Sequence, residues 1–169
     1  MNVRYRAFPL HPETPEEGQS LQSLFGADSA RLEGMIAHLR RTADELGLPF
    51  APRTMTYNSR LAQELGQWAA GHGREGQFHN AAFHAYFAEG SNVARKEVLL
   101  AICRASGLPV DEAAEVLASR SFAAAVDADW QLARRLGVTA VPTFIVGDQR
   151  LVGAQPYEAL EWLVRQPRG

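Results

Sequence analysis

Apolar residues through the middle of the chain recur every three or four positions, which is the spacing of amphipathic helices. Most of these periodic segments begin at an Asp, Asn or Ser that can cap a helix and end at a glycine. The pattern predicts helices over about 28–47, 58–73, 75–88, 92–107, 111–117 and 119–137. The central part of the chain is therefore expected to be helical.

Two of these segments carry further expectations. The first helix should turn one apolar face inward, made of Leu32, Met35, Ile36, Leu39, Ala43 and Leu46. The third carries an aromatic stripe made of Phe78, Phe83, Tyr86 and Phe87. Helical spacing favours core packing for this stripe. The alternative is that part of it roofs a substrate groove.

The two ends of the chain show a different pattern. Val3–Phe8 alternates between apolar and polar residues, which predicts a strand, and residues 11–26 follow as a loop. Thr143–Val146 and Arg150–Val152 flank a Gly-Asp turn and predict a hairpin, after which a helix opens at Pro156. Strand, helices, hairpin and helix in this order predict an α/β sheet domain with a large helical insertion.

Composition narrows the classes of function. The chain has 169 residues, a length that fits one domain or one small domain with a large insertion. Its residues are 46% hydrophobic and 21% charged, which is usual for a globular protein. A net charge of −2 gives no basic surface for nucleic acid. The sequence holds no apolar run long enough to span a membrane, and its first residues lack the apolar stretch of a signal peptide. We therefore expect a cytoplasmic protein without nucleic-acid or membrane partners.

A single cysteine, Cys103, excludes an internal disulfide, a CxxC pair and a cysteine zinc site within this sequence. It follows four apolar residues on a predicted helix, so we expect it to be buried. His72, His79 and His84 are seven and five residues apart, whereas two metal ligands on one helix face are three or four apart. We expect no metal site.

The segment from Gly137 to Val146 is the most specific in the chain. Pro142 stands immediately before a predicted strand and must lie at its first residue or on a sheet edge, because proline has no N–H to donate. A cis Val141–Pro142 bond would suit this position, although most bonds preceding proline are trans. The local sequence leaves both isomers open.

Leu136–Phe144 resembles the cis-proline loop of DsbA-like thioredoxin-fold proteins. Other segments resemble the FrnE-like branch of that family, which is related to 2-hydroxychromene-2-carboxylate isomerase and kappa-class glutathione transferase. These segments are Val3–Pro15, Asn58-Ser59 with Ala62 and Leu65, Phe78 with Ala85–Gly90, and Gly153–Pro156.

The resemblance implies a thioredoxin-like domain at 1–15 and 122–169 and a helical insertion at 16–121. It implies protein disulfide oxidoreduction as the activity of the family. It also implies substrate-binding residues at Ala140, Val141, Pro142 and Asn58. The backbone of the residue before the proline would pair with an extended peptide or a thiol ligand. No cofactor is implied, although glutathione stays open as a ligand.

The chain departs from this family pattern at its start, because the first strand and the CxxC helix have no counterpart. Gln63 and Glu64 also replace an expected His-Arg pair. Without a second cysteine, the chain as written is expected to be redox-inactive, with no catalytic residue. The missing strand would lie between Val3–Phe8 and Thr143–Val146. These two segments could pair directly, a second copy could fill the gap as a homodimer, or the native protein could be longer.

Three functions remain open from the sequence. The first is a disulfide oxidoreductase represented by an incomplete chain. The second is a non-catalytic module that binds a peptide, a thiol ligand or a second copy at the proline loop. The third is a glutathione-dependent isomerase or transferase relative, whose catalytic serine position is missing here too.

Overall fold

The structure is a computed structural model that describes residues 3–26 and 28–166. The chain divides into two compact units. The helical unit is His11–Val126, and the sheet unit combines Met1–Leu10 with Asp127–Gly169. The sequence placed these boundaries a few residues away, and the assignment of a thioredoxin-like domain to 1–15 and 122–169 stays a prediction.

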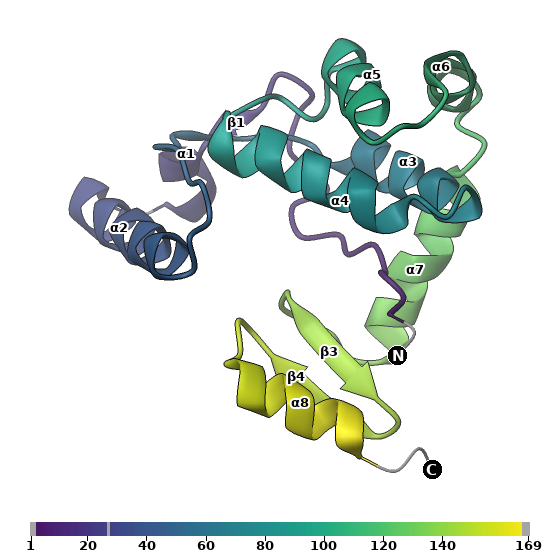
Figure 1. Ribbon diagram of the computed structural model, residues 1–169. Helices are drawn as coiled ribbons and strands as arrows, with labels where there is room; N and C mark the ends of the chain where they lie inside the picture. Colours follow the sequence, from purple (N-terminus) through teal and green to yellow (C-terminus); the bar gives the residue numbers. More distant parts are fainter. Residues whose placement is uncertain (1–2, 27, 167–169) are drawn as a thin grey trace. The chain divides into compact units, whose positions relative to one another are not determined.

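Helices dominate the His11–Val126 unit (Figure 1). Its elements are β1 (Gln19–Ser20), α1 (Leu21–Phe25), α2 (Ser29–Glu45), β2 (Met55–Thr56), α3 (Arg60–Gly71), α4 (Glu75–Phe83), the π-helix η1 (His84–Ala88), α5 (Lys96–Ala105) and α6 (Val110–Ser119), and it contains the start of α7 (Ala123–Arg135). No helix of the described chain combines the length and the hydropathy that crossing a membrane requires.

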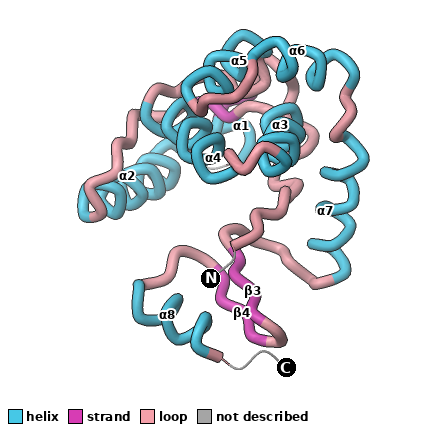
Figure 2. The backbone as a smooth tube through the Cα atoms, turned by 45° about the vertical axis from the view of Figure 1, so that its right-hand side comes forward, coloured by secondary structure: helices cyan, strands magenta, loops and turns pink. Residues whose placement is uncertain are grey.

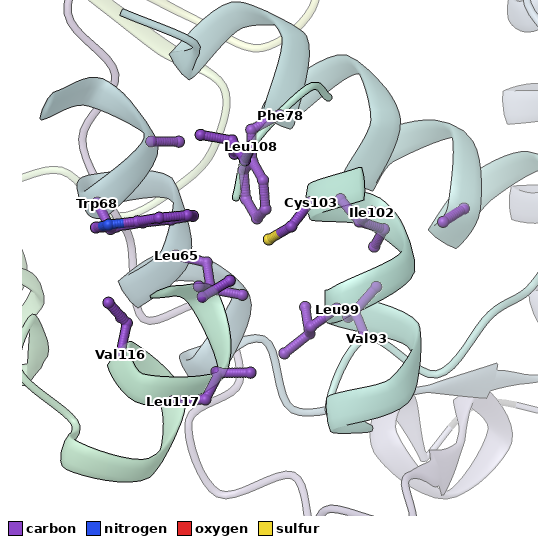
Figure 3. Close-up of a cluster of buried hydrophobic side chains, with 13 residues drawn as sticks. Leu65, Trp68, Phe78, Val93, Leu99, Ile102, Cys103, Leu108, Val116 and Leu117 are labelled. Carbon is purple, nitrogen blue, oxygen red and sulfur yellow. The ribbon is translucent and has the colours of Figure 1, made fainter. Parts of the chain in front are cut away.

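The core of the helical unit lies between α3, α4, α5 and α6. Figure 3 shows Leu65 and Trp68 from α3, Phe78 from α4 and Leu99 from α5 converging on this interior. Leu65 and Leu99 are completely buried, and Phe78 nearly so. Burying such side chains contributes roughly 1.5–3 kcal/mol each, so these helices are mutually stabilised.

Residues 11–26 and the segment before α3 are more ordered than the sequence predicted. Instead of an unbroken loop followed by helices, β1 pairs antiparallel with β2, with Gln19 opposite Thr56, and the short helix α1 follows. Strands of two residues are too short to show the alternation from which strands are recognised in a sequence. This pairing joins the N-terminal loop to the segment that leads into α3.

The apolar face predicted for α2 is largely exposed. Met35, Leu39 and Leu46 are all exposed, and Ala43 is the only member of the predicted face that is buried. In both Figure 1 and Figure 2, α2 projects from the other helices of its unit. Periodicity correctly predicted the helix and its Asp28 cap, which accepts a hydrogen bond from the Arg31 N–H at 2.7 Å. Periodicity shows that α2 has an apolar face, but it does not show that another part of the chain packs against that face.

The sheet unit contains β3 (Thr143–Val146), β4 (Gln149–Val152) and α8 (Tyr157–Arg165), together with most of α7. The two strands form the predicted antiparallel hairpin, with Thr143 opposite Val152, and α8 contacts both strands (Figure 2). Leu163 of α8 is almost completely buried. The predicted hairpin and the helix after Pro156 are confirmed.

The strand predicted for Val3–Phe8 does not form among the described residues. The segment is instead held to α7 by Asp129, which accepts hydrogen bonds from Arg6 Nη1 at 3.0 Å and from the Ala7 N–H at 2.9 Å. An alternating pattern forms a strand only where another strand supplies backbone hydrogen bonds, and within the described chain β3 and β4 pair only with each other. The direct pairing of Val3–Phe8 with Thr143–Val146 is therefore not observed.

Gly18 permits the tight turn before β1, and this generates a prediction. Its φ is +88°, and an added Cβ would lie 2.4 Å from Cδ1 of Tyr57 and 2.6 Å from the Thr56 carbonyl oxygen. Gly26 has a φ of +55° but open space around it. We expect Gly26→Ala to cost about 1–2 kcal/mol of unfolding free energy, from backbone conformation alone. Gly18→Ala should cost clearly more, because the backbone must also move.

Urea unfolding of the two variants measures this difference. Equal losses of stability for Gly18→Ala and Gly26→Ala would show that the close approach to Tyr57 and Thr56 is not a constraint.

Candidate functional site

The loop that leads into β3 is held by backbone contacts and by one side chain from the hairpin. α7 ends before Gly137, whose φ is +62°, and the Val138 N–H returns to the Ala133 carbonyl at 2.9 Å. The Arg150 guanidinium donates to the carbonyls of Leu136 and Gly137. The loop between α7 and β3 is thereby attached to β4.

The predicted binding residues Ala140, Val141 and Pro142 follow directly. The Val141–Pro142 peptide bond is cis. The Thr143 hydroxyl donates to the Ala140 carbonyl at 2.6 Å, and the Gly153 N–H donates to the Pro142 carbonyl at 2.8 Å. Within the described chain no hydrogen bond uses the backbone of Val141, whose residue is 42% exposed.

The hairpin register shows which backbone groups of β3 face away from β4. In an antiparallel ladder, alternate residues direct their N–H and C=O groups toward the partner strand. The Gly153–Pro142 hydrogen bond continues the register of β3 and β4, so Pro142, Phe144 and Val146 face β4. Thr143 and Ile145 therefore direct their N–H and C=O groups to the other edge, which we call the open edge. No described strand pairs there.

Asn58, the fourth predicted binding residue, belongs to the helical unit and has a local structural task. Its Oδ1 accepts the Arg60 N–H at 2.9 Å, which caps the start of α3. Its Nδ2 donates to the carbonyls of Pro12 at 3.2 Å and Thr14 at 2.7 Å. Its side-chain amide is thus engaged within the protein, and ligand binding by Asn58 stays a prediction.

A second asparagine, which the sequence suggested only as a helix cap, has the same arrangement. Asn92 Oδ1 accepts the Ala94 N–H at 2.9 Å, and Asn92 Nδ2 donates to the Glu16 carbonyl at 3.0 Å. Together the two asparagines hold the loop before β1 at three carbonyls. Nothing in the local pattern around Asn92 reveals a partner 76 positions away.

Glu64 of the helical unit is paired with two arginines, although the sequence marked it only as a departure from the family motif. Its side chain is completely buried. It accepts hydrogen bonds from Arg60 Nε at 2.7 Å and from Arg120 Nε and Nη2 at 2.7 and 2.6 Å. Burial alone would raise the pKa of Glu64, but the hydrogen bonds and charges of Arg120 and Arg60 outweigh it and lower that pKa.

Cys103 lies in the core, as predicted, and has the properties of an apolar side chain. It is fully buried, and Figure 3 shows its sulfur among Phe78, Leu65 and Leu99. Burial raises the pKa of the thiol to about 11. A thiolate is the reactive form, so this position suppresses the nucleophilicity that exchange with a disulfide requires.

The three neighbouring histidines each have different partners in the structure. His72 lies against Trp68 and Glu112, with Nε2 at 3.5 Å from the Glu112 carboxylate, and His84 Nδ1 is 3.3 Å from Glu89. His79 packs against Phe78 and Phe83, and burial lowers its pKa. No group of three or more potential metal ligands is found among the described residues.

The family model for the DSBA-like thioredoxin domain matches residues 1–165. The crystal structure of a "probable DsbA oxidoreductase" from Streptomyces coelicolor is similar, with a TM-score of 0.86 and 26% identity over 96% of this chain and 76% of that one. A "putative protein disulfide isomerase" from Nitrosomonas europaea has a TM-score of 0.65 and 17% identity over 82% of this chain and 74% of that one, a likeness of fold. No curated protein matches the sequence.

The chain therefore belongs to the DsbA-like thioredoxin-domain family. The family and the α/β fold with a helical insertion, both expected from the proline loop and the other matching segments, are confirmed.

The buried carboxylate generates a stability prediction. Glu64→Gln keeps the shape of the side chain but removes the charge, and hydrogen bonds to charged groups contribute about 1.5–3 kcal/mol. We expect a loss of about 2–3 kcal/mol of unfolding free energy at pH 7. The exposed pair of Glu161 and Arg165, joined at 2.8 Å, provides the control, and Glu161→Gln should cost less than about 0.5 kcal/mol.

This contribution should also depend on pH. Because the pKa of Glu64 is lower in the folded than in the unfolded chain, its stabilising effect is present at neutral pH and is lost as pH falls through the folded pKa. The difference between wild type and Glu64→Gln, measured by urea unfolding, should shrink below about pH 4. A difference independent of pH would contradict an ionised Glu64.

Proposed function

We propose that this chain is a polypeptide-binding member of its family that does not exchange disulfides as it stands. An extended segment of another polypeptide adds as a strand to the open edge, pairing with the backbone of Thr143 and Ile145 and with Val141 beside them. The observation that supports this most directly is the one-sided pairing of β3, whose outward N–H and C=O groups meet no described strand.

Strand addition fits the exposed chemistry of this segment. The added backbone would bind through main-chain hydrogen bonds, and alternate side chains would supply selectivity. Val141 and Ile145 are exposed and apolar, so an incoming strand gains apolar contact besides hydrogen bonds. The ligand is therefore an extended segment with apolar side chains, and a second copy of this chain meets that description as well.

The burial of Cys103, the only thiol in the sequence, argues against disulfide exchange. Exchange needs a thiolate with access to a disulfide, and Cys103 is buried with its pKa raised to about 11. The proposal assigns the chain no catalytic residue and no cofactor. Three parts of this proposal rest on the sequence alone. They are membership of the FrnE-like branch, a cytoplasmic location and glutathione as a second ligand.

Reduction of insulin by dithiothreitol tests the absence of exchange. We expect the wild type and Cys103→Ala to leave the rate at the value measured without protein. Acceleration by the wild type that disappears in Cys103→Ala would show that the buried thiol is catalytic and would overturn this part of the proposal.

Amide exchange and peptide binding test the open edge. In the free protein, the Thr143 and Ile145 amides should exchange with solvent at least tenfold faster than those of Phe144 and Val146, which face β4. Reduced and carboxymethylated α-lactalbumin is a suitable probe, because it is unfolded and has no thiol. Its addition should protect the Thr143 and Ile145 amides.

Ile145→Pro removes one outward N–H without removing a hydrogen bond to β4, and a proline on a strand edge is compatible with a sheet. We expect at least tenfold weaker binding of the probe, measured by fluorescence anisotropy. Ile145→Val is the matched control that keeps the N–H and should bind like the wild type. Protection of the Phe144 and Val146 amides in Ile145→Pro verifies that the hairpin is intact. Unchanged binding by that intact variant would refute strand addition.

A further inference from the structure

A row of rings in mutual contact lies along α4 and η1 of the helical unit, with Phe83 exposed and the other rings partly buried. We call it the aromatic face and define it by His79, Phe83, Phe87, Phe50 and Arg53. The ring centroids of His79 and Phe83 are 6.0 Å apart, those of Phe83 and Phe87 6.2 Å, and those of Phe87 and Phe50 6.2 Å. Phe83 was predicted to lie in the core, but its residue is 54% exposed.

The π-helix η1 carries Phe87, the central ring of this row. Glu89 N–H bonds to the His84 carbonyl five residues earlier, so η1 is wider than an α-helical turn and rotates the residues that follow Phe83. The Phe87 carbonyl accepts the Ala51 N–H at 2.9 Å, which attaches residues 50–53 beside η1. Phe50 thereby stacks on Phe87 at an interplanar angle of 21°. Single π-turns inside helices occur frequently at functional sites.

Arg53 adds a positive charge to this face. Its Cζ lies 4.1 Å from the centroid of the Tyr86 ring and 4.9 Å from that of Phe87. Nη2 donates to the Met55 carbonyl at 3.5 Å, and no carboxylate among the described residues forms an ion pair with Arg53. A guanidinium held against rings has further N–H groups with which to bind a carboxylate.

The spacing of the rings matches that of side chains in an extended polypeptide. Side chains on one face of a strand recur every second residue, about 6.6–6.8 Å apart. We propose that the aromatic face binds an extended polypeptide segment with aromatic side chains at alternate positions and an acidic side chain next in that series. One aromatic side chain stacks on the exposed ring of Phe83. The next packs beside Phe87, whose ring is partly buried, and the carboxylate pairs with Arg53.

This binding is separate from strand addition at the open edge. It uses side chains of the helical unit, whereas the open edge uses backbone groups of the sheet unit. Either proposal can fail without the other, and one set of variants distinguishes the two.

The probe is a dye-labelled peptide, Ser-Phe-Ser-Phe-Ser-Asp-Ser, whose affinity is measured by fluorescence anisotropy. Two control peptides test the two parts of the proposal. One replaces the aspartate by lysine, and the other places the two phenylalanines next to each other so that they point to opposite faces. Each should bind at least tenfold more weakly than the probe.

Protein variants then locate the site. Phe83→Ser removes an exposed ring and should weaken binding at least tenfold. Phe144→Ser removes an exposed phenylalanine of β3 and is the matched control, expected to bind the probe like the wild type. Arg53→Glu should reject the aspartate peptide and bind the lysine peptide instead. This exchange of preference would not follow from a merely structural role of Arg53.

Peptide-induced shifts of backbone amide resonances in the wild type provide a readout without substitutions. Shifts at residues 50–53 and 79–88 would support the proposal. It would be overturned if the probe did not bind, if its shifts fell only on β3, or if Phe83→Ser and Arg53→Glu bound it like the wild type.

Discussion

The helical unit depends on a buried carboxylate. Glu64 of α3 accepts hydrogen bonds from Arg60 in its own helix and from Arg120 immediately after α6, while Arg60 Nη2 donates to the carbonyl of Ala123 at the start of α7 at 2.8 Å. Arg120 has a φ of 52°, a left-handed conformation that costs a non-glycine residue roughly 1–2 kcal/mol. The ion pair offsets that cost. A single acid thus determines how α6 ends and how the chain turns into α7, with an apolar core packed beside it.

Hydrogen-bonding side chains also order the irregular segments of this unit. Asn58 and Asn92 each cap a turn with the amide oxygen and hold the loop before β1 with the amide nitrogen. Because each amide serves two segments at once, the loop is attached to the starts of two separate helical stretches. In the sheet unit, Asp129 likewise binds two groups, since one carboxylate oxygen accepts from the Arg6 side chain and the other from the Ala7 N–H.

The elements with strong local signals could be predicted from the sequence. Helix boundaries followed from Asp28 and from the glycines, and the β3–β4 hairpin followed from two β-branched runs around a Gly-Asp turn. The role of Glu64 could not be predicted, because Arg120 is 56 residues away and only the fold brings the two together. The exposure of Phe83 was missed for a different reason. Phe83 lies five residues after the buried Phe78, and residues on one face of an α-helix are three or four apart, so Phe83 falls on another face of α4. At the candidate site, Pro142 marked the start of β3, whereas the direction of each backbone group required the observed register.

The burial of Cys103 has a practical consequence for work on this protein. With its pKa raised to about 11, only about one thiol in ten thousand is ionised at pH 7, and the sulfur is enclosed by the core. Maleimide reagents should therefore leave the native cysteine unmodified while the protein is folded. A cysteine introduced at a chosen surface position can carry a spectroscopic label in an otherwise unaltered background. Conversely, the appearance of a reactive native thiol reports directly that the helical core has opened.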